Sequence, residues 1–302
     1  MSTPLKIAAF ALGLVAVFGA ALGVGTAVGP VGTAAADRPA HGMTDDMAGH
    51  DEATGEHDAG HLPAGLEVTQ DGYTLALADD ALPAGAATPV AFRILGPDGR
   101  PVTGYDRSHD EALHLIAVRR DLGGFQHVHP ALGADGVWRI PLALTPGTWR
   151  LFADFVPSDD GQNRVLGADL AVPGDYSPTP LPAASTTAEV DGYTVRLDGA
   201  LVPGEESGLT LSVSRDGRPV TDLQPYLSAY GHLVVLRDGD LAYLHVHPTG
   251  EPGDGTTRPG PDVTFRTTAP SAGTYRLFLD FRHGDVVRTA EFTMTTAQEA
   301  TR

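Results

Sequence analysis

The chain has 302 residues, with 38 acidic and 20 basic side chains and a formal net charge of −18. This acidity excludes a nucleic-acid binder that works by bulk electrostatics, and the absence of cysteine excludes disulfides, zinc fingers, thiolate copper sites and cysteine nucleophiles. The length suggests about two domains, and 37 glycines and 24 prolines indicate a turn-rich, β-type globular chain.

Residues 1–36 have the features of an export signal. Lys6 precedes an uncharged run from Ile7 to Ala36 that is apolar through Val28. Ala34-Ala35-Ala36 offers a small-residue cleavage site before Asp37. Residues 7–28 are also long enough to span a bilayer if they are retained, since roughly 20 apolar residues suffice. Both readings, a cleaved signal peptide and a membrane anchor, place the rest of the chain outside the cytoplasm and leave this segment as its only membrane contact.

Residues 37–62 form a predicted disordered tether, because they contain almost no β-branched or aromatic side chains with which to build a core. Histidine and methionine recur here at short intervals among acidic residues, a composition typical of metal capture. A solvated acidic spacer is the alternative. The candidate ligands are His41, Met43, Met47, His50, His57 and His61.

Beyond the tether the sequence repeats itself. DGYTL at 71–75 returns as DGYTV at 191–195, HVHP at 127–130 returns at 245–248, and GTWRLFADF at 147–155 returns as GTYRLFLDF at 273–281. A repeat of about 110 residues corresponds to an independent domain rather than to a solenoid unit. We therefore expect domains at 63–173 and 188–297, joined by a proline-rich linker at 174–187.

Each copy contains short apolar runs separated by Gly, Pro and Asp, and helical periodicity is missing throughout. About seven short strands per copy predict an all-β fold of two tandem immunoglobulin-like β-sandwiches. In the second copy the expected strands are Tyr193–Leu197, Leu209–Ser214, His232–Arg237, Leu241–His247, Val263–Thr267, Thr274–Phe281 and Val286–Met294.

Both copies contain the pattern H-x12-H-V-H-P. The turn residues between the first and second histidine predict an antiparallel hairpin. In the second copy, a loop at Gly239-Asp240 pairs His232 with His247, whereas a loop at Asp238-Gly239 pairs it with His245, and in either register all three rings share one face. Imidazole is the commonest metal ligand, so we expect a metal site in each domain, although hydrogen-bonded structural histidines are the alternative. The two predicted sites are His114, His127, His129 and His232, His245, His247.

A few other residues are weaker candidates for metal ligands at these two sites. Asp154 and Asp280 are candidates for a fourth ligand, but each shares a strand face with an arginine, Arg150 or Arg276, so a surface Arg–Asp pair is the commoner explanation. Separately, the histidines without a repeated partner, at positions 109 and 283, are expected on the surface, although His283, in a loop after the LFLDF strand, could approach a site.

The chain resembles bacterial extracytoplasmic proteins of the YtkA-like and copper-resistance type. The resemblance lies in the exported leader, the His/Met-rich tether and the segments DGY, HLIAV…FQHVHP and GTWRLFADF. It covers most of residues 63–297, and its most specific part is the histidine hairpin. It implies a β-sandwich that binds metal or hands it over. For such a protein we expect a membrane metal transporter or another extracytoplasmic metal protein as partner.

These features predict an exported, non-enzymatic metal-binding protein for metal capture, relay or resistance. Imidazole ligands without thiolates favour copper, with zinc or nickel as alternatives. A metalloenzyme with an open three-histidine site is a second hypothesis. An envelope scaffold or adhesion module with structural histidines is a third.

Overall fold

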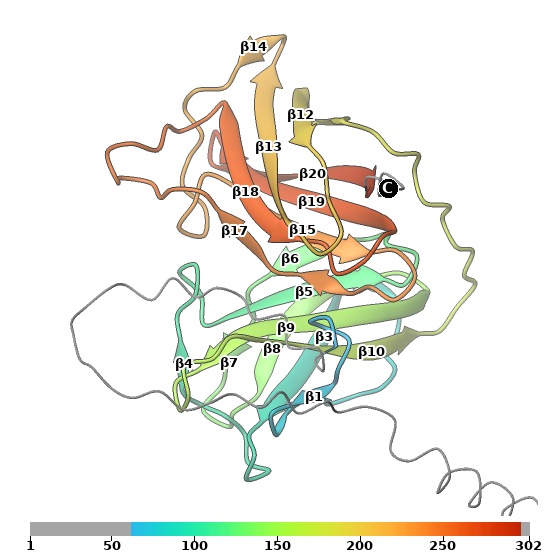
Figure 1. Cartoon of the computed structure of the whole chain (residues 1–302). Helices are drawn as coiled ribbons and strands as arrows, with labels where there is room; N and C mark the ends of the chain where they lie inside the picture. Colours follow the sequence, from blue (N-terminus) through green and yellow to red (C-terminus); the bar gives the residue numbers. More distant parts are fainter. Residues whose placement is uncertain (1–61, 297–302) are drawn as a thin grey trace, which may run out of the picture. The chain divides into compact units, whose positions relative to one another are not determined.

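The computed structural model describes residues 62–296. The predicted leader, and the predicted tether up to residue 61, lie outside this range. All regular elements within it are β-strands, as the all-β prediction requires, and they build two sandwiches (Figure 1). Within the same range, no helix has the length and apolar character needed to cross a membrane.

The first sandwich has two antiparallel sheets. One contains, in spatial order, β1 (Thr69–Gln70), β2 (Tyr73–Leu77), β3 (Gly85–Leu95), β8 (Trp138–Leu144) and β7 (Ala131–Leu132). The other contains β10 (Arg164–Val172), β9 (Gly147–Pro157), β5 (Leu113–Arg119) and β6 (Gln126–Val128), with β4 (Tyr105–Asp106) paired to β9. If β2, β3, β5, β7, β8, β9 and β10 are named A to G, the sheets read ABED and CFG, which is the immunoglobulin arrangement.

The second sandwich repeats this order. One sheet contains β11 (Thr187–Val190), β12 (Tyr193–Gly199), β13 (Glu206–Arg215), β18 (Asp262–Thr268) and β17 (Val246–Pro248), with β14 (Arg218–Pro219) paired to β13. The other contains β16 (Tyr243–Leu244), β15 (His232–Arg237), β19 (Thr274–His283) and β20 (Val286–Thr295). The strand expected at Leu241–His247 is divided into β16 and β17, which belong to different sheets.

Each sandwich has its own core, made by alternate side chains of its two sheets. Trp138 and Trp149 are buried in the first core, and Tyr193 and Tyr275 in the second. Because both tryptophans of the chain lie in the first core, each sandwich can be followed by a separate optical probe.

A third apolar cluster joins the two sandwiches. It is formed by the outward faces of β5 and β9 in the first and of β15 and β19 in the second. Phe125 stacks on Phe278 with ring centroids 3.9 Å apart, and Tyr243 packs against Phe152 at 5.7 Å. In the internal repeat, Phe125 is equivalent to Tyr243 and Phe152 to Phe278, so the two pairs are equivalent contacts. The contact therefore has approximate two-fold symmetry. The buried members are Ile116, Val118, Leu122, Phe152, Val165, Val234, Leu236, Leu241, Tyr243 and Phe278.

Candidate metal centre

The first predicted histidine trio is gathered at the edge of the β5–β6 hairpin. The register pairs Leu115 with Val128 and Ile116 with His127, and one further step sets His114 opposite His129. Side chains on one face of a hairpin recur at every second position, so the three imidazoles share a face. Among the residues that the structure describes, this trio is the one group of three or more His, Asp or Glu side chains arranged to hold a metal ion.

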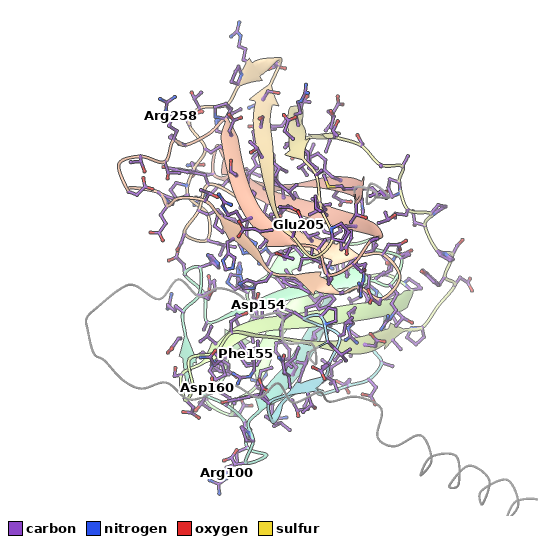
Figure 2. All side chains as sticks on the ribbon, viewed as in Figure 1. Arg100, Asp154, Phe155, Asp160, Glu205 and Arg258 are labelled. Carbon is purple, nitrogen blue, oxygen red and sulfur yellow. The ribbon has the colours of Figure 1, made fainter. Side chains whose placement is uncertain are left out.

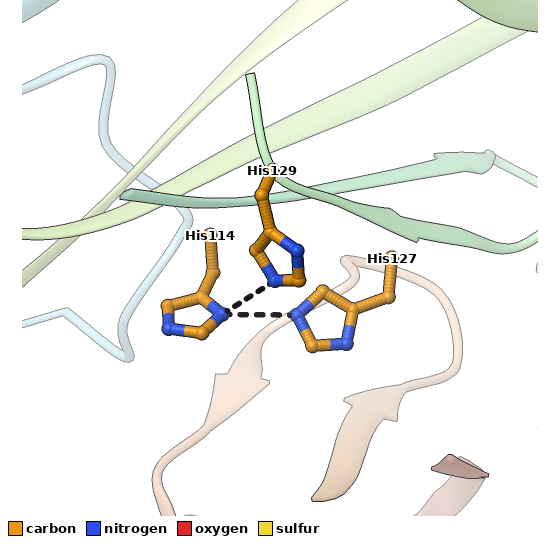
Figure 3. Close-up of side chains that lie close together, drawn as sticks. All are labelled: His114, His127 and His129. Atoms are coloured by element: carbon orange, nitrogen blue, oxygen red, sulfur yellow. Dashed lines mark hydrogen bonds between the residues drawn. The ribbon is translucent and has the colours of Figure 1, made fainter. Parts of the chain in front are cut away.

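The three rings point toward one another (Figure 3). Nδ1 of His114 lies 3.1 Å from Nε2 of His127 and 3.2 Å from Nε2 of His129. Two nitrogens bound about 2.05 Å from a tetrahedral ion would be about 3.3 Å apart. The spacing of the trio is therefore close to that of a tetrahedral metal site.

Hydrogen bonds on the outer side of the trio assign two of the tautomers. Nε2 of His114 lies 2.9 Å from the carbonyl oxygen of Ser108, which can only accept, so Nε2 carries the hydrogen and Nδ1 has a lone pair. Nδ1 of His127 lies 2.8 Å from Oδ2 of Asp280. With that carboxyl group ionised, Nδ1 of His127 donates and Nε2 has a lone pair. Two lone pairs then face each other across 3.1 Å, an arrangement that a cation between them would relieve.

A proton is a poor candidate for that cation. The side chain of His127 is only 1% exposed, and burial, reinforced by the neighbouring histidines, lowers its pKa well below the ordinary value of 6.5. Burial likewise lowers the pKa of His129 to about 4. These two rings are therefore neutral near pH 7, which is the form that binds a metal ion.

The two candidate aspartates accept hydrogen bonds from other side chains, and neither pairs with the arginine of its own strand. Asp280 accepts from His127 and, through Oδ1, from the Thr289 hydroxyl at 2.6 Å. Asp154 (Figure 2) accepts from Nδ2 of Asn163 at 2.7 Å.

The arginines use other partners. Arg150 pairs with Asp169, and Arg276 pairs with Glu291. The expected surface Arg–Asp pairs do not form because this strand face is not a surface: the other sandwich covers it.

The second predicted trio is not brought together. β15 and β16 pair in the register of a Gly239-Asp240 loop, but Val246–Pro248 then pairs with β18 in the opposite sheet. The chain thus changes sheets at His245, whereas the first copy changes only after its HVHP segment. His245 and His247 are exposed, with ring centroids 4.3 Å apart. His232 packs instead on the first trio, with its ring 5.5 Å from that of His114.

His109, which we expected on the surface, belongs to the histidine cluster. It is half-buried, with its ring 5.5 Å from that of His232 and 6.2 Å from that of His114. A bridge between Ser108 and Glu111 shapes its loop, and the Ser108 carbonyl holds His114. The lack of a repeated partner concealed this role, and no sequence signal would have revealed it.

His283, the other unrepeated histidine, lies 2.7 Å from the Tyr193 hydroxyl and 3.1 Å from Asp222, outside the cluster. The six predicted tether ligands, His41, Met43, Met47, His50, His57 and His61, lie outside the described residues.

Fold and site together define a pair of immunoglobulin-like β-sandwiches with a histidine cluster at their contact. The chain belongs to the family described as "Domain of unknown function (DUF8832)", whose model matches residues 67–174 and 188–298, once in each sandwich. No curated protein matches the chain.

Solved structures with similarity to the chain include the Escherichia coli adhesin FdeC, with 15% identity over 76% of this chain and 65% of that one and a TM-score of 0.24. Another is a mutant alpha-2-macroglobulin of Salmonella, with 14% identity over 78% of this chain and 15% of that one and a TM-score of 0.23. The S-layer protein SbsC, domains 4 and 5, gives 10% identity over 77% of this chain and 100% of that one, with a TM-score of 0.21. These TM-scores are low, so the assignment of the fold depends on the strand order described above.

Proposed function

We propose that this chain is an exported, non-enzymatic protein that binds one transition-metal ion through His114, His127 and His129. The observation that carries the proposal is the convergence of three imidazole nitrogens, with the tautomers of two of the rings set by Ser108 and Asp280. A carboxylate or carbonyl behind each ligating histidine is the usual outer shell of a metal site, because it fixes ring orientation and raises ligand basicity.

Copper is the favoured ion, with zinc or nickel as alternatives. Three imidazoles suit Cu(II), which lies at the top of the affinity order for divalent first-row metals, and the chain has no thiolate that would favour Cu(I). The net charge of −18 gives a negative potential around the site that attracts cations. The predicted tether would add weaker capture sites, and the predicted leader would place binding outside the cytoplasm, where a membrane metal transporter or another metal protein exchanges the ion.

The hydrogen bonds of Asp280, the carboxylate that contacts the trio, favour binding over catalysis. A hydrolytic metalloenzyme needs a general base free to act on metal-bound water, whereas Asp280 already accepts hydrogen bonds from His127 and Thr289. This favours capture, storage or relay of the ion as the role of the site.

Titration calorimetry with Cu(II) and Zn(II) tests the proposal, in protein whose four tether histidines are replaced by alanine. The wild-type sandwiches should bind one ion saturably, and His127→Ala should abolish that binding. His245→Ala is the matched control, because it changes the equivalent histidine of the second copy, and it should bind like the wild type. Absence of saturable binding in the wild type, or equal binding by His127→Ala, would contradict the proposal.

A further inference from the structure

His232 begins β15 in the second sandwich, yet it lies against the ligands of the first. Its ring is nearly parallel to that of His114, at an interplanar angle of 14° and 5.5 Å between centroids. It is closer still to His127, at 4.7 Å. These two contacts place an imidazole of the second sandwich directly beside the predicted metal site.

Nδ1 of His232 is buried and has no hydrogen-bond partner. The neighbouring rings are fully engaged, since His114 and His127 each use one nitrogen outside the trio and one inside it. A buried polar atom without a partner carries the cost of its lost hydration, and such atoms are uncommon in folded proteins unless a ligand satisfies them. Bonding to an ion would remove that cost.

The second sandwich also reaches the site through Asp280, which holds His127. His232 and Asp280 are paired residues in the β15–β19 register. Two side chains at one position of this sheet therefore meet the first sandwich at the same place, one as a hydrogen-bond acceptor and one with an unused nitrogen.

We propose that His232 turns its ring toward the trio when an ion binds and becomes the fourth ligand, so that the metal ion is bonded to both sandwiches at once. This inference rests on the proposed function and adds a consequence to it. An ion bound by both sandwiches stabilises their contact, and loss of the ion loosens it, since a ligand stabilises the state that binds it. Four protein ligands without an open position are also the pattern of a holding site rather than of a catalytic one.

Two measurements on the intact chain, with the four tether histidines replaced by alanine, test this inference. The first is hydrogen–deuterium exchange with and without Zn(II), read on peptides that cover residues 126–130 and 231–237. Zinc should slow exchange in both. Protection confined to residues 126–130 would overturn the inference, and this measurement needs no substitution within either sandwich.

The second measurement is Zn(II) affinity by competition with a chromophoric chelator. His232→Ala should weaken binding by at least about tenfold, the lower end of the effect expected even for groups that only support a ligand. His247→Ala, which removes an exposed histidine of the same sandwich, should change affinity by less than roughly threefold. Wild-type binding with an unchanged affinity in His232→Ala would refute the fourth ligand and leave the three-histidine site intact. No zinc binding by the wild type would instead refute the proposed function.

Discussion

The hydrogen bond between Asp280 and His127 gives the sharpest prediction, because the same carboxylate is expected to be costly for folding and useful for metal binding. Burial raises the pKa of Asp280 to about 7. The difference from the ordinary value of 3.8 is roughly three units, equivalent to about 4 kcal/mol against the ionised form. Asp280→Asn removes that charge while keeping the shape of the side chain.

We expect two effects of opposite direction. Metal-free Asp280→Asn at pH 8 should be at least as stable as the wild type, because a neutral amide has no buried charge to desolvate. Its affinity for Cu(II) or Zn(II) should nevertheless fall by 10- to 100-fold, about 1.4–2.7 kcal/mol, because the carboxylate behind His127 is lost.

The assays are urea unfolding of the metal-free protein and calorimetric metal titration. Asp154→Asn is the matched control, since Asp154 is paired with His114 as Asp280 is with His232. Asp154 is held by Asn163 rather than by a ligand of the trio, so this control should change affinity by less than roughly threefold. Equal losses in the two variants, or reduced stability of Asp280→Asn with unchanged affinity, would refute the reasoning.

Three further predictions concern the contact between the sandwiches and the response to pH and metal. Phe278→Ala removes a fully buried ring and should cost about 3–5 kcal/mol. The unfolding curve from Trp138 and Trp149, which reports the first sandwich, should then separate from the circular dichroism curve; coincident curves would contradict this. Burial lowers the pKa of four cluster histidines, His109, His127, His129 and His232. As the pH falls, these histidines are therefore protonated in the unfolded chain before they are protonated in the folded one. Below about pH 6.5 the free energy of unfolding should decrease by up to about 1.4 kcal/mol per pH unit for each histidine. Asp280, whose pKa is raised, is protonated first in the folded chain between about pH 7 and 3.8, which offsets the loss of stability from one of the histidines. The other histidines still lower the stability, so an unfolding midpoint unchanged from pH 7 to 5 would contradict the prediction. A metal concentration 100 times the Kd should add about 2.7 kcal/mol of stability, reversed by a chelator; an unchanged melting temperature would contradict it.

Local patterns were sufficient to predict the strands and the first hairpin. Alternating apolar residues and turn signals place Tyr193, Leu209 and Thr274 in strands, and they lie in strands. The parity of H-x12-H-V-H predicts a shared face, which the first copy has.

The second copy could not be predicted in the same way. Its hairpin register is one of the two expected, but the chain leaves the sheet at His245 to pair with β18. The HVHP sequence is the same in both copies, so it cannot predict that the two segments pair with different sheets. That pairing depends on which partner strand lies nearby.

The contact between the sandwiches was missed although a signal for it was present. HLIAV and HLVVL are continuous apolar runs rather than alternating ones, and strands of this kind are buried on both faces. Both faces of β5 and β15 are indeed buried. The run of apolar residues predicts a covered face, but it does not say that the covering surface is the other copy, nor that His232 would reach the first trio.

Anomalous X-ray diffraction from crystals grown with Cu(II) or Zn(II), recorded at the absorption edge of the metal, tests the central claim most directly. We predict one peak among the three imidazoles, about 2.0–2.1 Å from Nδ1 of His114 and from Nε2 of His127 and His129. A metal peak found only at other residues, or none in crystals with the metal in excess, would contradict it.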